Sequence, residues 1–156
     1  MALHEQSVGA TDEWYTPAYV FEAMNVRFDS DPCPALFHQS PARSWCFLRG
    51  RWEGFVWMNP PFGGRNGIVP WLEKFFAHGD GVCLTPDRTS APWWQRFARQ
   101  ADAILFISPK IKFLGPDGPG GSPAQGTTLM AAGPRGVQAL RNARAAQLGL
   151  LLSHAA

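Results

Sequence analysis

The sequence predicts a protein of the α/β class. Short apolar runs typical of buried strands alternate along the chain with segments in which apolar residues recur at helical spacing. The chain has 156 residues, of which 46% are hydrophobic, enough for one core and too little for two. We therefore expect residues 1–156 to form a single domain, with long connections rich in its 14 Pro and 16 Gly.

The amino-terminal part is expected to contain one helix and one strand. Residues 1–12 are polar and are expected to be flexible. Thr16-Pro17 has the pattern of an N-cap followed by Pro at the first helical position, which predicts a helix from there to about Met24. The stretch 26–31 is a candidate for a short strand.

Strands and helices are expected to alternate through the rest of the chain. The expected elements are an irregular stretch at 35–52, a strand at 55–58, a helix at 68–78, a strand at 81–85, a helix at 92–100, a strand at 103–107, an extended stretch at 111–114, a mobile loop at 115–126, a strand at 127–132 and a helix at 136–147. Each predicted helix carries an apolar stripe with polar residues opposite it, which indicates packing against a sheet.

The apolar run 55–58 leads directly into Asn59-Pro60-Pro61-Phe62, the most informative part of the sequence. In an open α/β sheet, ligands bind in a crevice beyond the carboxyl ends of the strands. An amide, two rigid prolines and an aromatic ring are therefore expected at the place where such a fold binds its substrate. A turn alone would explain the Asn and one Pro, but not the second Pro or the aromatic residue.

These residues suit the methylation of a flat substrate that carries an amine. The lone pair of an amine on a heteroaromatic ring is delocalised, and acceptors on both N–H groups make it available for attack. The Asn59 side-chain oxygen and the Pro60 carbonyl can be these acceptors. The ring of Phe62 offers a stacking surface, worth roughly 1–3 kcal/mol per base. The motif predicts amine methylation, and adenine in DNA, adenine in RNA and a protein glutamine remain alternative acceptors.

Charge is distributed unevenly along the chain, whose net charge is +2. Residues 1–31 contain six acidic residues and one arginine, a balance of −5, whereas residues 32–156 carry +7. A basic excess is expected of a surface that binds a phosphate backbone, although ordinary solvated surfaces have similar compositions.

Metal sites and membrane segments are not expected. Cys33, Cys46 and Cys83 form no C-x-x-C pair, which argues against zinc and against a disulfide framework. No apolar run reaches membrane-spanning length, and the amino terminus is acidic where a signal peptide is basic. We expect an intracellular protein that is not attached to a membrane.

Several blocks of sequence occur in an order that is shared with a known family. They are Glu13-Trp14-Tyr15-Thr16-Pro17, Asp31-Pro32-Cys33, Trp52-Glu53-Gly54, Trp57-Met58-Asn59-Pro60-Pro61-Phe62, Leu84-Thr85-Pro86 with Arg88-Thr89 and Trp93-Trp94, and Ala103-Ile104-Leu105-Phe106 with Lys112-Phe113. With these blocks, the chain resembles the phage and prophage DNA N6-adenine methyltransferases, often called phage Dam-like. The resemblance implies a three-layer, Rossmann-like methyltransferase fold with a mostly parallel sheet and no separate target-recognition domain.

The resemblance also implies a cofactor, a partner and residue roles. The cofactor would be S-adenosylmethionine (SAM), and the partner would be double-stranded DNA, with the target adenine flipped out of the helix. The implied catalytic residues are Asn59, Pro60, Pro61 and Phe62; the implied SAM-binding residues are Trp14, Thr16, Pro17, Asp31, Cys33 and Asn59; the implied DNA contacts are Arg65, Arg88, Lys110 and Lys112. The setting would be the cytoplasm of a bacterium that carries the phage or prophage, with a link to restriction–modification.

Two departures from the family pattern concern the DNA-facing surface more than the chemistry. Ser90-Ala91 replaces an expected acidic residue and Thr, and Ser108-Pro109 stands where Gly-Arg is common. Arg88 could instead form a surface ion pair with Asp87. A non-catalytic prophage remnant that binds SAM or DNA is the remaining alternative, which the intact Asn59–Phe62 motif argues against.

Overall fold

Secondary structure alternates along the chain as the sequence predicts. The computed structural model describes residues 15–33, 43–44, 48–63, 66–115, 118–119 and 125–153, with 43–44 and 118–119 described by their backbone. The elements are α1 (Ala18–Met24), β1 (Ser30–Asp31), β2 (Arg43–Ser44), β3 (Val56–Met58), α2 (Val69–His78), β4 (Gly81–Pro86), α3 (Pro92–Ala98), β5 (Ala103–Ile107), β6 (Leu114–Gly115), β7 (Gly118–Pro119), β8 (Thr127–Ala132), α4 (Gly133–Ala145) and β9 (Gly149–Ser153). Within these residues no helix has the length and apolar character that crossing a membrane requires.

Seven strands form one mixed sheet in the order β2-β1-β3-β4-β8-β5-β9. The pairs on the β2 side of β4 are parallel, whereas β8 is antiparallel to both β4 and β5, and β9 is antiparallel to β5. The α/β class is confirmed, but the expected mostly parallel sheet needs correction, because β8 and β9 both run against the other five strands. A separate β6–β7 hairpin follows β5.

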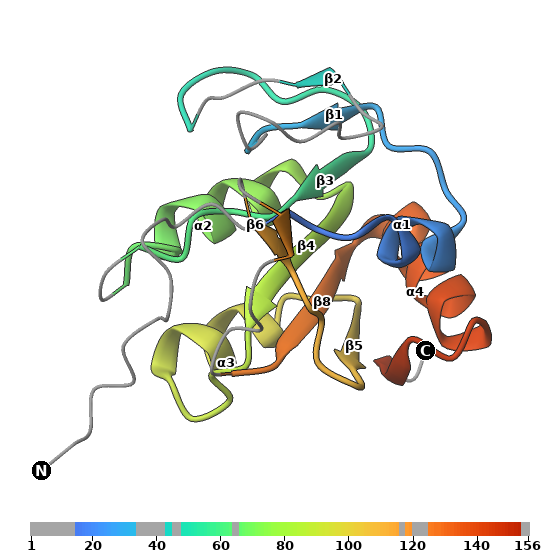
Figure 1. Cartoon of the computed structure of the whole chain (residues 1–156). Helices are drawn as coiled ribbons and strands as arrows, with labels where there is room; N and C mark the ends of the chain where they lie inside the picture. The colour runs from blue at the N-terminus through green and yellow to red at the C-terminus, as the bar shows by residue number, and fades with distance from the viewer. Residues whose placement is uncertain are drawn as a thin grey trace, which may run out of the picture.

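Helices cover both faces of the sheet, which gives three layers (Figure 1). Along β3, Val56 and Met58 pack with α2 and α3, while Trp57 packs with α1 and α4. The same alternation along β4 sends Cys83 to the first face and Val82 to the second. Successive side chains of a strand point to opposite faces, so a continuous apolar run has both of its faces buried.

Several element boundaries differ from the sequence-based expectation. Helix α1 begins at Ala18, and Thr16 makes no side-chain capping bond to it. Helix α4 begins at Gly133, three residues earlier than expected, with Pro134 in its first turn, where the missing N–H costs nothing. Of the stretch expected to be a strand at 26–31, only Ser30 and Asp31 form a strand, which pairs with β2 and β3.

Strand β9 was not expected from the sequence. It pairs with β5 along Gly149–Ser153, and its Leu150 and Leu152 are 63% and 52% exposed. Leu151, between them, packs against the core, so exposure alternates along β9 although the residue types do not, which leaves no alternating pattern to read in the sequence. The expected flexible segment 1–12 and most of the expected loop at 115–126 lie outside the described residues.

An ionic network ties α4 to the amino ends of the strands. Arg135, near the start of α4, contacts the carboxylate of Asp80 through two nitrogens and lies 3.6 Å from that of Asp29. The hydrogen bond to Asp80 is the main cause of a raised pKa of Arg135. Asp29 also accepts a hydrogen bond of 2.8 Å from the backbone N–H of Phe55, which fixes the entry into β3.

Helix α4 lies so close to β4 that one of its positions has room only for glycine. A Cβ atom on Gly136 would lie 2.4 Å from the backbone oxygen of Gly81, and Gly136 is buried. Since that oxygen belongs to the sheet backbone, it cannot move aside without shifting β4.

We predict that Gly136→Ala destabilises the protein by about 1–3 kcal/mol through overpacking. At a helix position with room for a side chain, the same change would raise the free energy of unfolding by roughly 0.5–1 kcal/mol. Urea unfolding followed by circular dichroism measures the difference. Arg141→Ala, at an exposed position of the same helix, is the control and should change the free energy of unfolding by less than about 0.5 kcal/mol. A stabilised Gly136→Ala variant would contradict the close approach.

Candidate active site at the carboxyl ends of the strands

The order of the strands creates a crevice between β1 and β3. From β1 the sheet extends to β2 on one side and to β3 on the other, so the direction of winding reverses at this point. Such a reversal leaves a crevice beyond the carboxyl ends of the two strands. Asp31 is the last residue of β1, and Asn59 directly follows β3.

Asp31 and Asn59 lie on neighbouring strand ends. Ser30 pairs with Val56, which places Asp31 level with Trp57 and two residues before Asn59. Ordinary strand spacings then separate the Cα atoms of Asp31 and Asn59 by about 8 Å. By the same alternation, Asp31 and Asn59 share the face of Trp57, which is the face covered by α1. Two residues expected in the site from the sequence are thus brought together.

Thr16, which lies just before α1, contacts the Asn59 side chain. The Asn59 side-chain nitrogen Nδ2 donates a hydrogen bond of 3.2 Å to the Thr16 hydroxyl oxygen Oγ1. Thr16 is 2% exposed, and the following Pro17 is also buried. The sequence predicts that Thr16 caps a helix, but its hydroxyl contacts Asn59 instead, across 43 positions of sequence.

Asp31 and Cys33 form a tight turn after β1. The Asp31 carboxylate oxygen Oδ1 accepts a hydrogen bond of 2.9 Å from the Cys33 backbone N–H, and Asp31 is 2% exposed. This is a turn geometry that Asp favours, and it is an alternative to a role in ligand binding. The two uses are compatible, because an ionised carboxylate has about four acceptor positions.

The residues after Asn59 differ in their exposure. Pro60 is buried and Pro61 is exposed, as expected when the chain leaves the sheet. Phe62 is half-buried and packs against the apolar clusters on both faces of the sheet. Its ring therefore lies across the end of the sheet and is held by the core.

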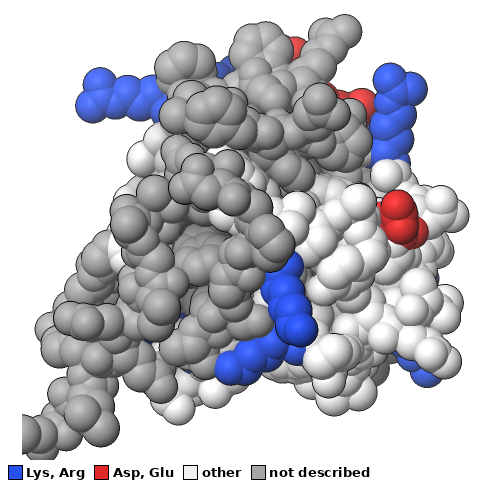
Figure 2. All heavy atoms as spheres, viewed as in Figure 1, with Lys and Arg blue, Asp and Glu red and all other residues white. Residues whose placement is uncertain are grey.

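Three of the four Lys and Arg residues that the sequence predicts to contact DNA are described by the structure, and they lie at the same edge of the sheet as Asn59. Arg88 follows β4, and Lys110 and Lys112 follow β5, strands that both run in the direction of β3; all three side chains are exposed. On the face shown in Figure 2, the Lys and Arg side chains are dispersed and do not form one patch. Trp14 and Arg65, also expected in the site, lie outside the described residues.

The expected alternative for Arg88, an ion pair with Asp87, is not found. The carboxylate of Asp87 instead accepts a hydrogen bond from the Thr128 hydroxyl, which joins β4 to β8. Among the residues that the structure places, the ion pairs involve Arg96 and Arg135 and leave Arg88 out.

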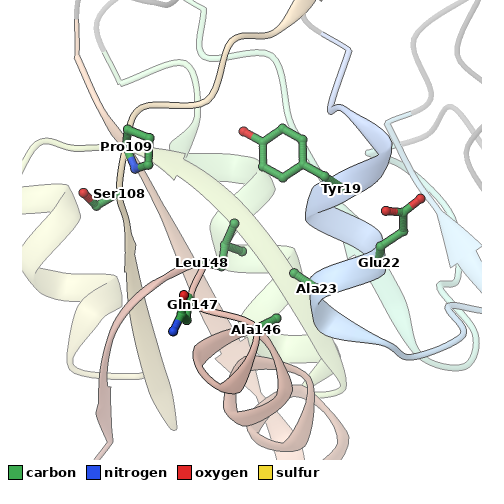
Figure 3. Close-up of a pocket in the computed structure, with 8 residues that line it drawn as sticks. All are labelled: Tyr19, Glu22, Ala23, Ser108, Pro109, Ala146, Gln147 and Leu148. Carbon is green, nitrogen blue, oxygen red and sulfur yellow. The ribbon is translucent and has the colours of Figure 1, made fainter.

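A separate pocket of about 460 Å³ opens beside the start of α1 (Figure 3). Tyr19 and Glu22 line it from α1, Ser108 and Pro109 from the turn after β5, and Leu148 from the turn after α4. Burial raises the pKa of the Tyr19 hydroxyl. The residues that line this pocket include none of those expected in the site, but they do include the Ser108-Pro109 departure from the family pattern.

Two features of the site could not be found from the sequence. Tyr15 and Leu114 exchange two backbone hydrogen bonds of 3.0 and 3.1 Å, which fix the segment that carries Thr16. Thr127 pairs with Pro86 at the amino end of β8, and its buried hydroxyl has no hydrogen-bond partner among the described residues. Long-range backbone pairing and the lack of a partner have no local sequence signal.

Comparison with known proteins identifies the family. A sequence model of the DNA N-6-adenine-methyltransferase (Dam) family matches residues 5–130. No curated protein and no solved structure matches the chain. The matched range includes α1, β1, β3 and the Asn59–Phe62 motif, which together form the candidate site, and covers well over half of the sequence. The chain therefore belongs to the DNA N-6-adenine-methyltransferase (Dam) family.

Proposed function

We propose that the protein transfers a methyl group from SAM to N6 of adenine in DNA. The observation that carries this proposal is the position of Asn59, which lies at the end of β3, beside Asp31 and hydrogen-bonded to Thr16. Membership of the Dam family supports DNA as the substrate class.

The chemistry requires positioning more than proton transfer. The Asn59 side-chain oxygen and the Pro60 carbonyl would accept the two hydrogens of the adenine amine and make its lone pair available. Phe62, held by the core on both faces of the sheet, would stack against the purine. SAM supplies an electrophilic methyl group on a sulfonium, so the adenine amine needs no strong base before it attacks, and a neutral amide can take the place of a carboxylate.

The residues at the end of β1 fit the cofactor. The buried Asp31 carboxylate lies in the crevice and can accept hydrogen bonds from an amine or a hydroxyl of SAM in addition to that of Cys33. Pro17 and Cys33 would form apolar walls, together with Trp14. The positions of Asp31 and Asn59 on adjacent strands support a donor site and an acceptor site that share one crevice.

Double-stranded DNA would approach the carboxyl edge of the sheet. N6 of adenine is paired inside the duplex, so the base must leave the helix to reach Asn59. Arg88, Lys110 and Lys112, with Arg65, would bind phosphates around the crevice. The proposed setting is the cytoplasm of a bacterial host that expresses a phage or prophage gene.

The direct test is to incubate the protein with SAM that carries a labelled methyl group and with unmethylated duplex DNA. The proposal expects label at N6 of adenine in DNA, with less incorporation when RNA or a glutamine peptide replaces DNA. Label that appears in RNA or in peptide but never in DNA would assign the same chemistry to a different acceptor.

Asn59→Ala is predicted to lower the rate of methyl transfer by at least about 100-fold, because one of the two acceptors is lost. SAM binding measured by calorimetry should change little. Gln100→Ala, which removes an exposed amide at the end of α3, is the control and should keep the wild-type rate. Unchanged turnover in Asn59→Ala would remove this residue from the mechanism.

Arg88→Ala and Lys112→Ala are each predicted to reduce the salt dependence of DNA binding. The slope of the logarithm of the binding constant against the logarithm of salt concentration should fall by about 1 in each variant, as one phosphate contact is lost. Fluorescence anisotropy at several salt concentrations measures the slope. Arg144→Ala, on the exposed side of α4, is the matched control. Equal slopes in all four proteins would place DNA elsewhere.

A further inference from the structure

We propose that the pocket beside α1 binds a second nucleobase of the DNA, distinct from the target adenine. The inference rests on the proposed function, because it extends the DNA contact along the same edge of the sheet. The pocket has a volume of about 460 Å³ and opens between Tyr19 of α1 and the Ser108-Pro109 turn after β5 (Figure 3). Its volume lies within the range of about 300–1,000 Å³ that is typical of small-molecule sites.

The pocket lies at the same edge of the sheet as Asn59. Ser108 and Pro109 directly follow β5, which runs in the direction of β3, so both turns leave the sheet at its carboxyl edge. Strands β4 and β8 lie between β3 and β5, which separates the two strand ends by about 14 Å. This separation is close to the width of a DNA major groove, about 12 Å. One bound duplex can therefore reach both places.

An extended segment with two cations connects the pocket to the candidate site. Buried and exposed residues alternate along 110–114, and the side chains of Lys110, Lys112 and Leu114 are exposed. Successive side chains of an extended chain point in opposite directions, so these three point to the same side. The segment ends where Leu114 exchanges two backbone hydrogen bonds with Tyr15, beside the crevice. A DNA backbone that follows this segment leads from the crevice to the pocket.

The charge of the pocket favours a neutral group over a phosphate. Among the described residues that line it, Glu22 is the one charged residue, and there is no Lys or Arg. Figure 3 shows the Glu22 carboxylate directed away from the turn after β5. A phosphate inside the pocket would be repelled by this carboxylate without a cation to offset it. A nucleobase is uncharged, and Lys110, directly after Pro109, can bind the phosphate of the same nucleotide.

Tyr19 supplies a ring on which a base can stack. Its side chain is 46% exposed, and its ring projects from α1 toward Pro109 (Figure 3). Burial raises the pKa of the Tyr19 hydroxyl, so the hydroxyl stays protonated at neutral pH and can donate a hydrogen bond. The Ser108 hydroxyl and the Gln147 amide, which also line the pocket, offer donors and acceptors to the edge of a base.

The walls of the pocket are held apart by contacts of their own. The Ser108 backbone N–H donates a hydrogen bond of 3.1 Å to the Leu148 carbonyl, which joins the turn after β5 to the turn after α4. Between the helices, Asn142 Nδ2 of α4 donates a bond of 2.9 Å to the Met24 carbonyl of α1. Two alanines, one from each side, line the space between these contacts. A base can therefore enter without a rearrangement of the walls.

A base that enters the pocket must leave the DNA stack. The cost of extrusion is lowest for a base that has no pairing partner. Flipping of the target adenine leaves its partner thymine unpaired, which makes this thymine one source of the base. A base that flanks the adenine on the same strand is the other source. Both have the chemistry that the pocket fits, and their positions in the DNA distinguish them.

The test measures coupling between Tyr19 and individual bases. Duplexes that lack the base at one nucleotide, scanned along both strands, are compared with the intact duplex by fluorescence anisotropy. Tyr19→Ala should weaken binding of the intact duplex roughly five- to 100-fold. It should change binding of the duplex abasic at the captured position by less than about twofold, since the stacking partner is already absent. Tyr19→Phe keeps the ring and should retain most of the affinity.

The position of the coupling identifies the source of the base. Coupling opposite the methylated adenine assigns its partner thymine, whereas coupling on the same strand assigns a flanking base, and either supports the inference. Unchanged affinity in Tyr19→Ala would overturn it and leave the pocket to a ligand unrelated to DNA. An equal loss of affinity for the intact duplex and for every abasic duplex would also overturn it, because Tyr19 would then contact the backbone.

A second variant blocks the pocket and leaves Tyr19 in place. Ala146→Trp puts a large side chain into the lining, whereas Ala145→Trp, at the neighbouring exposed position outside the lining, is the matched control. Ala146→Trp should reproduce the loss of affinity of Tyr19→Ala, and Ala145→Trp should stay within about twofold of the wild type. Equal affinities of the two variants for the intact duplex would overturn the inference.

The binding scan also separates this inference from the proposed function. Coupling at one position without methyl transfer in any form would reject methylation of adenine and retain the base pocket. Methyl transfer to DNA with no coupled position would retain the proposed function and overturn the pocket as a site for a base.

Discussion

The constraint on which the structure depends is the burial of the central strands on both faces. Val56, Trp57 and Met58 of β3 and all six residues of β4 are buried, so neither strand has a position for an exposed polar side chain. Polar groups can gather only where the strands end, and Asn59 is the first residue after β3. Because helices cover both faces of these strands, polar side chains that could bind a ligand are confined to the strand ends.

The two edges of the sheet have different electrostatic character. At the amino edge, Asp29 and Asp80 share Arg135, so one cation offsets part of the charge of two carboxylates. At the carboxyl edge, Arg88 and Lys112 are exposed and form no ion pair with the described residues. A polyanion would meet less repulsion at the edge that carries the candidate site.

The sequence predicted local features well and long-range pairings poorly. Strands β5 and β8 begin and end at the expected residues, because each is an apolar run bounded by polar or turn residues. The run 127–132 gave no indication that it would lie between β4 and β5 and run against both. Strand direction depends on the edge at which the preceding connection ends, and here the chain re-enters the sheet at the edge where β5 ended, so β8 runs against β5.

Thr16 shows why the site itself could be predicted only in part. Thr-Pro before a helical segment is a helix-start pattern, and a helix does start there, yet the hydroxyl contacts a residue 43 positions away. A hydroxyl can accept a hydrogen bond from the amide nitrogen or donate one to the amide oxygen, so a Thr can hold an Asn side chain wherever the fold brings the two together. The fold brings Thr16 to Asn59 from a segment distant in sequence, so residues before and after β1 meet at the carboxyl end of β3.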